Sequence, residues 1–67
     1  MRWDFRIDVG ATKNVLTPLT PKAKEWAQTH MSPLRWEDSG VLIIDGKEDA
    51  DYWIDRIMAA RLKITAY

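Results

Sequence analysis

The feature that most constrains this chain is an unbroken apolar run at residues 41–44, in which three of the four side chains are β-branched. Such a run predicts a strand that is buried on most of its surface. It is followed at once by Asp45 and Gly46, and then by apolar residues at helical spacing. We expect that helix to pack onto the strand, so residues 40–61 form the unit around which the chain folds.

Local signals in the second half of that unit agree on a helix. Asp45 is predicted to be its N-cap, and Glu48, three residues later, completes a capping-box pattern. Acidic residues then lie near the start and basic residues near the end, which is the polarity that the helix dipole favours. The helix lacks an exit glycine and could run one or two residues further than Arg61. The predicted inward stripe is Ala50, Trp53, Ile54, Ile57 and Met58.

The N-terminal half contains a second pair of elements. Residues 2–9 alternate strictly between charged and apolar side chains, which predicts a strand with one wet face. Residues 10–18 show no periodicity and are predicted to be a connection. Thr20 as N-cap and Pro21 at the first helical position predict a helix over residues 21–31. Its inner face is predicted to carry Ala23, Trp26, Ala27, His30 and Met31.

Two short segments complete the predicted fold. Residues 33–40 are expected to form a loop that caps the core, with a short extended segment near residues 35–37, and residues 62–66 form a closing strand. The prediction is one α+β domain over residues 1–67, with a three-stranded sheet, two helices on one face and the order β-α-β-α-β. The direction of the first strand relative to the others is left open.

Size and composition limit how such a domain can be stabilised. A chain of 67 residues buries only about 60 % of its unfolded surface, and without cysteine it has neither disulfides nor thiolate-bound zinc. Packing of its four tryptophans is therefore expected to matter. We expect Trp3, Trp26 and Trp53 in the core. Trp36, in a predicted loop, is equally consistent with a lid on the core and with an interface hot spot.

Composition also bears on location and on the class of partner. Ten acidic and ten basic side chains balance, whereas a general nucleic-acid binder is usually basic. No apolar run approaches the roughly 18–20 residues that span a bilayer. Because the N-terminus enters a charged alternating pattern directly, we expect no secretory leader and a cytoplasmic location.

No arrangement of residues predicts catalysis. His30 is the only histidine, and no carboxylate shares its helical face, so packing or a dipole contact is the favoured interpretation. The acidic residues after Ile44 do not match a calcium loop and include Lys47, so capping explains them without a metal. We therefore predict that the protein is not an enzyme and uses no cofactor or metal.

One resemblance bears on function. The motif LTPKAKEW at residues 19–26, followed by Trp36 and by GVLII at residues 40–44, resembles a pattern in short uncharacterised open reading frames of bacteria and their phages. The resemblance covers roughly residues 16–64, and members would be expected to carry glycine where this chain has Arg61. It implies a phage or prophage accessory protein, and it implies no reaction or catalytic residue.

Charge is distributed unevenly along the chain. Residues 37–55 contain seven acidic side chains and one basic, a balance of 1 − 7 = −6, so the remainder carries +6. This pattern fits a solvated surface, or an acidic surface that docks on a basic partner protein. The second interpretation predicts a non-enzymatic interaction module that binds and inhibits a host protein, such as a defence or nucleic-acid-processing complex. Its predicted binding residues are Trp36, Glu37, Asp38, Glu48, Asp49, Asp51 and Asp55.

Two alternative functions belong to other functional classes. A self-associating structural protein would dimerise through an unprotected edge strand, with no membrane contact. A small nucleic-acid-binding protein is disfavoured, because the acidic half would repel phosphate. The basic residues that it would use are Arg2, Arg6, Lys13, Lys22, Lys24 and Lys63.

Overall fold

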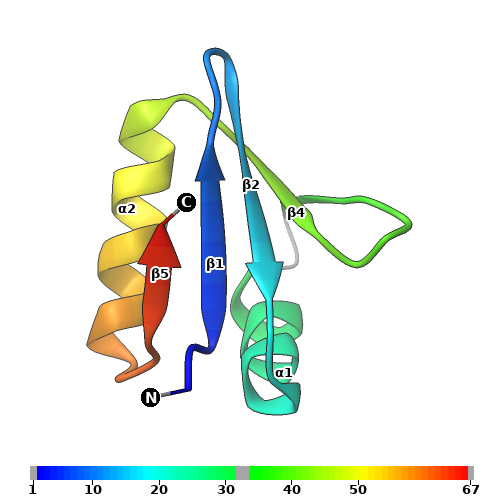
Figure 1. Ribbon diagram of the computed structural model, residues 1–67, viewed down its shortest axis with the longest axis vertical. Helices are drawn as coiled ribbons and strands as arrows, with labels where there is room; N and C mark the ends of the chain where they lie inside the picture. Colours follow the sequence, from blue (N-terminus) through cyan, green and yellow to red (C-terminus); the bar gives the residue numbers. More distant parts are fainter. Residues whose placement is uncertain (1, 32–33, 67) are drawn as a thin grey trace.

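The computed structural model, which describes residues 2–31 and 34–66, is a five-stranded mixed sheet with two helices (Figure 1). The α+β class and the two helices are as predicted, but the three-stranded sheet and the order β-α-β-α-β are wrong. The elements along the chain are β1 (Phe5–Val9), β2 (Lys13–Pro18), α1 (Pro21–His30), β3 (Arg35–Trp36), β4 (Leu42–Asp45), α2 (Lys47–Ala59) and β5 (Ile64–Ala66).

The strands lie side by side in the order β3-β4-β2-β1-β5. All neighbours are antiparallel except β1 and β5, which are parallel. The first strand therefore runs in the same direction as β4 and β5, and β2 and β3 run in the opposite direction. The apolar strand β4 is second from one edge, and the middle position belongs to β2.

The strand β2 is the main correction, because residues 10–18 were expected to be a connection. Its inward positions are Asn14, Leu16 and Pro18, so a polar side chain and a proline obscure the alternation. Pro18 lies at the end of the strand and pairs with Phe5, beyond the part that pairs with β4. The missing N–H of Pro18 therefore removes no hydrogen bond between β2 and β4.

Both helices pack on the same face of the sheet. The buried side chains of β1, β2 and β4 that share this face form one cluster with residues from both helices. On α1 the buried residues are two alanines, which let the helix backbone approach the sheet closely, whereas α2 buries Ala50 and Ile57. Ile43 points to the other face but is only 6 % exposed, so β4 is buried on both faces, as predicted. The buried residues of this cluster are Phe5, Ile7, Leu16, Leu42, Ile44, Ala23, Ala27, Met31, Ala50, Ile57 and Leu62.

Several side chains that were expected to face inward are exposed. Trp3 precedes β1, and Val9 lies at the outer end of that strand, with 41 % and 67 % of their surfaces exposed. Met58 is 59 % exposed because its neighbour Ile57 takes the inward position. His30 is also exposed, whereas Trp26 and Trp53 are half-buried against the core.

The two helices begin differently. Thr20 caps α1 as predicted, because its hydroxyl oxygen accepts a hydrogen bond of 3.1 Å from the N–H of Ala23. The capping box predicted for α2 is wrong. Asp45 is still part of β4 and pairs with Lys13, and the N-cap is Gly46, at φ 80°, with no side-chain cap.

The end of α2 is a Schellman motif without glycine. Leu62 donates its N–H to the carbonyl of Ile57 (3.2 Å), and Arg61 donates to the carbonyl of Met58 (2.9 Å). Arg61 therefore takes the left-handed position, at φ 63°. The helix ends at Ala59 and does not run further.

Asp4 joins the starts of three elements. Its carboxylate accepts a hydrogen bond from the Thr20 hydroxyl (3.0 Å) and another from the Lys63 N–H (2.9 Å). Its backbone N–H donates to the carbonyl of Lys63, and its carbonyl accepts from the N–H of Leu19. The pKa of Asp4 is lowered chiefly by the Lys63 N–H; partial burial opposes the shift and the Thr20 hydroxyl adds to it.

Replacing Asp4 by asparagine should lower the free energy of unfolding by about 1–2 kcal/mol at neutral pH, because charge-assisted hydrogen bonds are lost. A carboxyl whose pKa is lower in the folded state stabilises the fold above its unfolded pKa and loses that effect as the pH falls through its folded pKa. The difference between wild type and Asp4→Asn should therefore shrink below about pH 4. Urea unfolding at neutral and acid pH measures it. Asp38→Asn, at an exposed turn, is the control, and a difference independent of pH would contradict the assignment.

Replacing Arg61 by glycine should raise the free energy of unfolding by about 0.5–1 kcal/mol, since glycine adopts the left-handed conformation without a steric penalty. Chemical denaturation provides the measurement. Arg61→Ala removes the same charge but keeps the Cβ atom, and should give no gain. An equal gain in both variants would show that the charge, and not the backbone, is responsible.

Candidate functional site

The outward face of α2 carries most of the predicted binding residues. Its exposed side chains at spacings of three and four residues form one continuous surface along the helix. Tyr52 and Met58, which the prediction did not include, contribute exposed apolar area there, with 53 % and 59 % of their surfaces accessible. We call this surface the α2 strip; it consists of Glu48, Asp51, Tyr52, Asp55 and Met58. Asp49, also exposed, lies beside it.

The acidic side chains of this helix are not neutralised by neighbours. Across residues 2–31 and 34–66, the carboxylates of α2 make no ion pair within 4.0 Å. The nearby Arg56 is engaged with aromatic side chains instead. Its guanidinium donates to the Tyr52 hydroxyl (3.2 Å) and lies 5.7 Å from the ring centroids of both Tyr52 and Trp53. The negative charge is therefore open to solvent.

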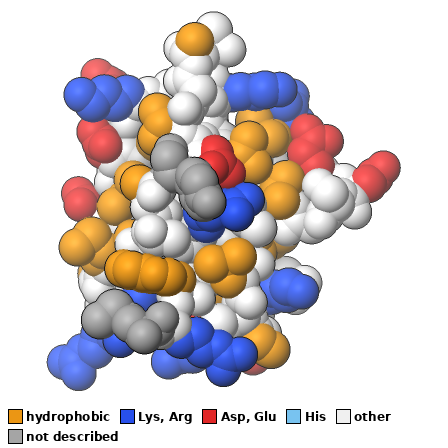
Figure 2. All heavy atoms as spheres, in the orientation of Figure 1, with side chains coloured by type: hydrophobic (Ala, Val, Ile, Leu, Met, Phe, Trp, Pro, Cys, Tyr) orange, Lys and Arg blue, Asp and Glu red, His pale blue; other side chains and the backbone are white. Residues whose placement is uncertain are grey.

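Glu37 and Asp38 lie in the turn between β3 and β4. That turn is closed by hydrogen bonds from the Glu37 N–H to the Val41 carbonyl and from the Gly40 N–H to the Glu37 carbonyl. β3 is an edge strand, and the turn is on the opposite flank from α2 (Figure 1). On the face drawn in Figure 2, acidic side chains accordingly lie along both flanks, with the sheet between them. The structure thus separates the predicted site into two groups.

Trp36 lies on β3 and packs against the edge of the core. It is half-buried and pairs with Leu42 of β4. On either side of it, the guanidinium group of Arg35 and the carboxylate of Glu37 lie 3.8 Å apart at exposed positions. Trp36 therefore covers part of the core, as one of its two interpretations predicted, and a role in binding stays a prediction.

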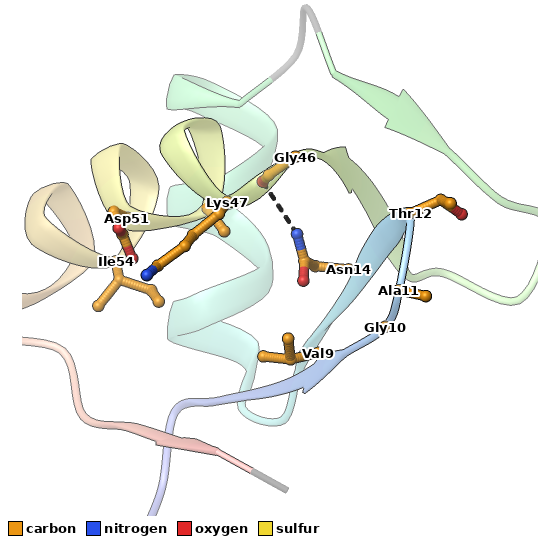
Figure 3. Close-up of a pocket in the computed structure, with 10 residues that line it drawn as sticks. Val9, Gly10, Ala11, Thr12, Asn14, Gly46, Lys47, Asp51 and Ile54 are labelled. Carbon is orange, nitrogen blue, oxygen red and sulfur yellow. Dashed lines mark hydrogen bonds between the residues drawn. The ribbon is translucent and has the colours of Figure 1, made fainter.

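A cavity of about 320 Å³ lies between the tip of the β1–β2 hairpin and the first half of α2 (Figure 3). Val9 and Ile54 form apolar walls, and Asn14, Lys47 and Asp51 supply polar groups. Sequence reasoning missed this cavity because it treated the segment that contains Asn14 as an irregular connection. The alternation of Asn14 and Leu16 was the available signal.

Asn14 is the most deeply placed polar group of the cavity, with 4 % of its surface exposed. Its side-chain amide donates to the carbonyls of Ile44 (3.1 Å) and Gly46 (3.0 Å), and so holds the bend between β4 and α2. Within the described residues its side-chain oxygen accepts no hydrogen bond, and this oxygen atom is not fully buried. Figure 3 shows this oxygen turned away from Gly46 and toward the cavity.

His30, the only histidine, does not line this cavity. It is exposed on α1, and its ring lies beside that of Trp26 with the centroids 4.7 Å apart and the planes tilted by 34°. Among residues 2–31 and 34–66, no three His, Asp or Glu side chains are grouped so as to hold a metal ion. The predicted lack of enzymatic activity stays a prediction. No helix in the described part of the chain has the length and apolar character needed to cross a bilayer.

The basic residues of the nucleic-acid alternative come from separate elements. Arg6 of β1 lies on the open face of the sheet, 3.5 Å from the Asp8 carboxylate. Lys13 is on β2, Lys22 and Lys24 are on α1, and Lys63 precedes β5. They do not form one row along a single element.

Comparison with known family models, with curated proteins and with solved structures finds no match to this chain. The resemblance to phage open reading frames therefore stays a prediction.

Proposed function

We propose that this chain is a non-enzymatic interaction module that binds a partner protein with a basic surface through the α2 strip. The observation that carries the proposal is a set of carboxylates that form no ion pair with any residue the structure describes, placed around two exposed apolar side chains, Tyr52 and Met58. Protein interfaces commonly combine such an apolar anchor with a polar rim. The carboxylates would steer a basic partner toward the strip and reject acidic ones.

The helix that carries the strip is firmly held on its other side. Ala50 and Ile57 are buried in the core, at 5 % and 0 % exposure. A surface fixed in this way loses little conformational entropy when a partner binds. At 13 residues, α2 offers a contact about 20 Å long.

The second predicted group, around Glu37 and Asp38, would contribute a separate contact, since it lies on the other flank. We further propose a biological role for the module, as an accessory protein of the phage type that inhibits a host protein by covering its surface. It rests on the resemblance of residues 19–26, 36 and 40–44. Edge-strand dimerisation is less well supported, because the edge strands β3 and β5 have two and three residues among those described.

Replacing Asp55 by lysine should reduce retention of the partner at least about tenfold, because like charges would then face each other across the contact. The immobilised chain is exposed to a bacterial lysate, and the retained proteins are identified by mass spectrometry at low and high salt. Tyr52→Ala should weaken retention without changing its dependence on salt.

The matched control is Glu25→Lys, which makes the same change in charge at an exposed position of α1. It should leave retention unchanged. Retention of the same proteins by Asp55→Lys, or loss of retention with Glu25→Lys as well, would contradict binding through the α2 strip.

A further inference from the structure

We propose that the cavity beside α2 is a receptor for an arginine side chain of the partner protein. This inference rests on the proposed function, because Asp51 belongs both to the α2 strip and to the cavity wall. It adds a specific anchor to what would otherwise be a general attraction between charged surfaces.

The polar groups of the cavity favour a guest that donates hydrogen bonds. The side-chain oxygen of Asn14 is an acceptor without a partner among the described residues, on a side chain that is 4 % exposed. The Asp51 carboxylate lies on the α2 side of the same space, and it too has no ion pair there. A guanidinium group carries N–H donors along a rigid planar fork, so it can address two acceptors at once.

The apolar walls fit the rest of an arginine side chain. Val9, Ala50 and Ile54 line the cavity between the polar groups, and arginine buries its methylene stem against such surfaces while its charged end finds acceptors. The volume of about 320 Å³ is at the lower end of the range for small-molecule sites. It suits a single side chain better than a bulky cofactor. The exposure of Val9 would decrease when the site is filled.

Among the described residues, Lys47 is the one basic side chain that lines the cavity. In Figure 3 its side chain extends from the start of α2 along the cavity, on the same side as Asp51. Within the described part of the chain it makes no ion pair within 4.0 Å, and at the first position of the helix the dipole disfavours a positive charge. Its exposed ammonium group therefore competes with a cationic guest and can be displaced by it. An anionic guest would instead depend on it.

The test is a titration of the full chain with N-acetyl-L-arginine amide at low salt. Two-dimensional ¹H–¹⁵N NMR spectra monitor the titration. Saturable shifts should appear at the Asn14 side-chain amide and at the backbone amides of Gly46 and Asp51. N-acetyl-L-citrulline amide, which has nearly the same shape without the charge, should bind at least fivefold more weakly than the arginine derivative. N-acetyl-L-glutamate amide should not bind at the cavity.

Three variants decide which groups are responsible. Asp51→Asn should weaken arginine binding at least threefold, and Lys47→Gln should strengthen it. Asp55→Asn removes an equivalent charge one turn further along α2, away from the cavity lining, and should change affinity by less than half as much as Asp51→Asn. Equal effects of Asp51→Asn and Asp55→Asn, equal binding of citrulline, or stronger binding of the glutamate derivative would overturn the proposal.

The two proposals can fail separately. If arginine does not bind the cavity but Asp55→Lys still abolishes partner retention, the α2 strip remains the binding surface and the arginine receptor is wrong. If arginine binds the cavity but no partner depends on Asp55, the receptor stands as a ligand site and the proposed function is wrong.

Discussion

The arrangement of this domain depends on one buried amide in its central strand. A polar side chain removed from water must find hydrogen-bond partners, or it costs stability. Asn14 meets that requirement through the carbonyls of Ile44 and Gly46, which can converge on it only if the chain bends sharply after β4. The bend places α2 on one face of the sheet, and Gly46 is the N-cap of that helix. The same interaction leaves the other end of the amide facing a cavity, so one side chain both orders the fold and shapes the candidate site.

The sequence predicted the elements whose signals are local. Thr20 and Pro21 mark the start of α1, and the apolar run before Asp45 marks a strand buried on both faces. It did not predict β2, because two of that strand's three inward positions carry a polar residue or a proline. Asn14 is acceptable there only because of carbonyl groups 30 and 32 residues away. No pattern within the strand itself shows that those partners exist.

The same distinction applies to the site. The exposure of Glu48, Asp51 and Asp55 follows from helical spacing, so their position on an outer face could be predicted. Their separation from Glu37 and Asp38 could not, since it depends on β3 pairing at the far edge of the sheet. The alternation of Asn14 and Leu16 could have indicated the strand that carries Asn14, but not the cavity as a whole, because the cavity combines the tip of a hairpin with a helix more than 30 residues later. Tyr52 lies on the same outer face by the same helical spacing, but it carries no charge and therefore did not belong to the predicted acidic surface.

Helix stability accounts for only some of the acidic residues on α2. Glu48 and Asp49 lie in the first turn, where the dipole favours negative charge. Asp51 and Asp55 lie beyond that turn, in positions where aspartate is a poor helix former and gains nothing from the dipole. Within the described residues neither has an ion pair to offset that disadvantage. Helix stability therefore does not account for these two carboxylates, and their placement beside Tyr52, Met58 and the cavity supports the proposed interaction surface.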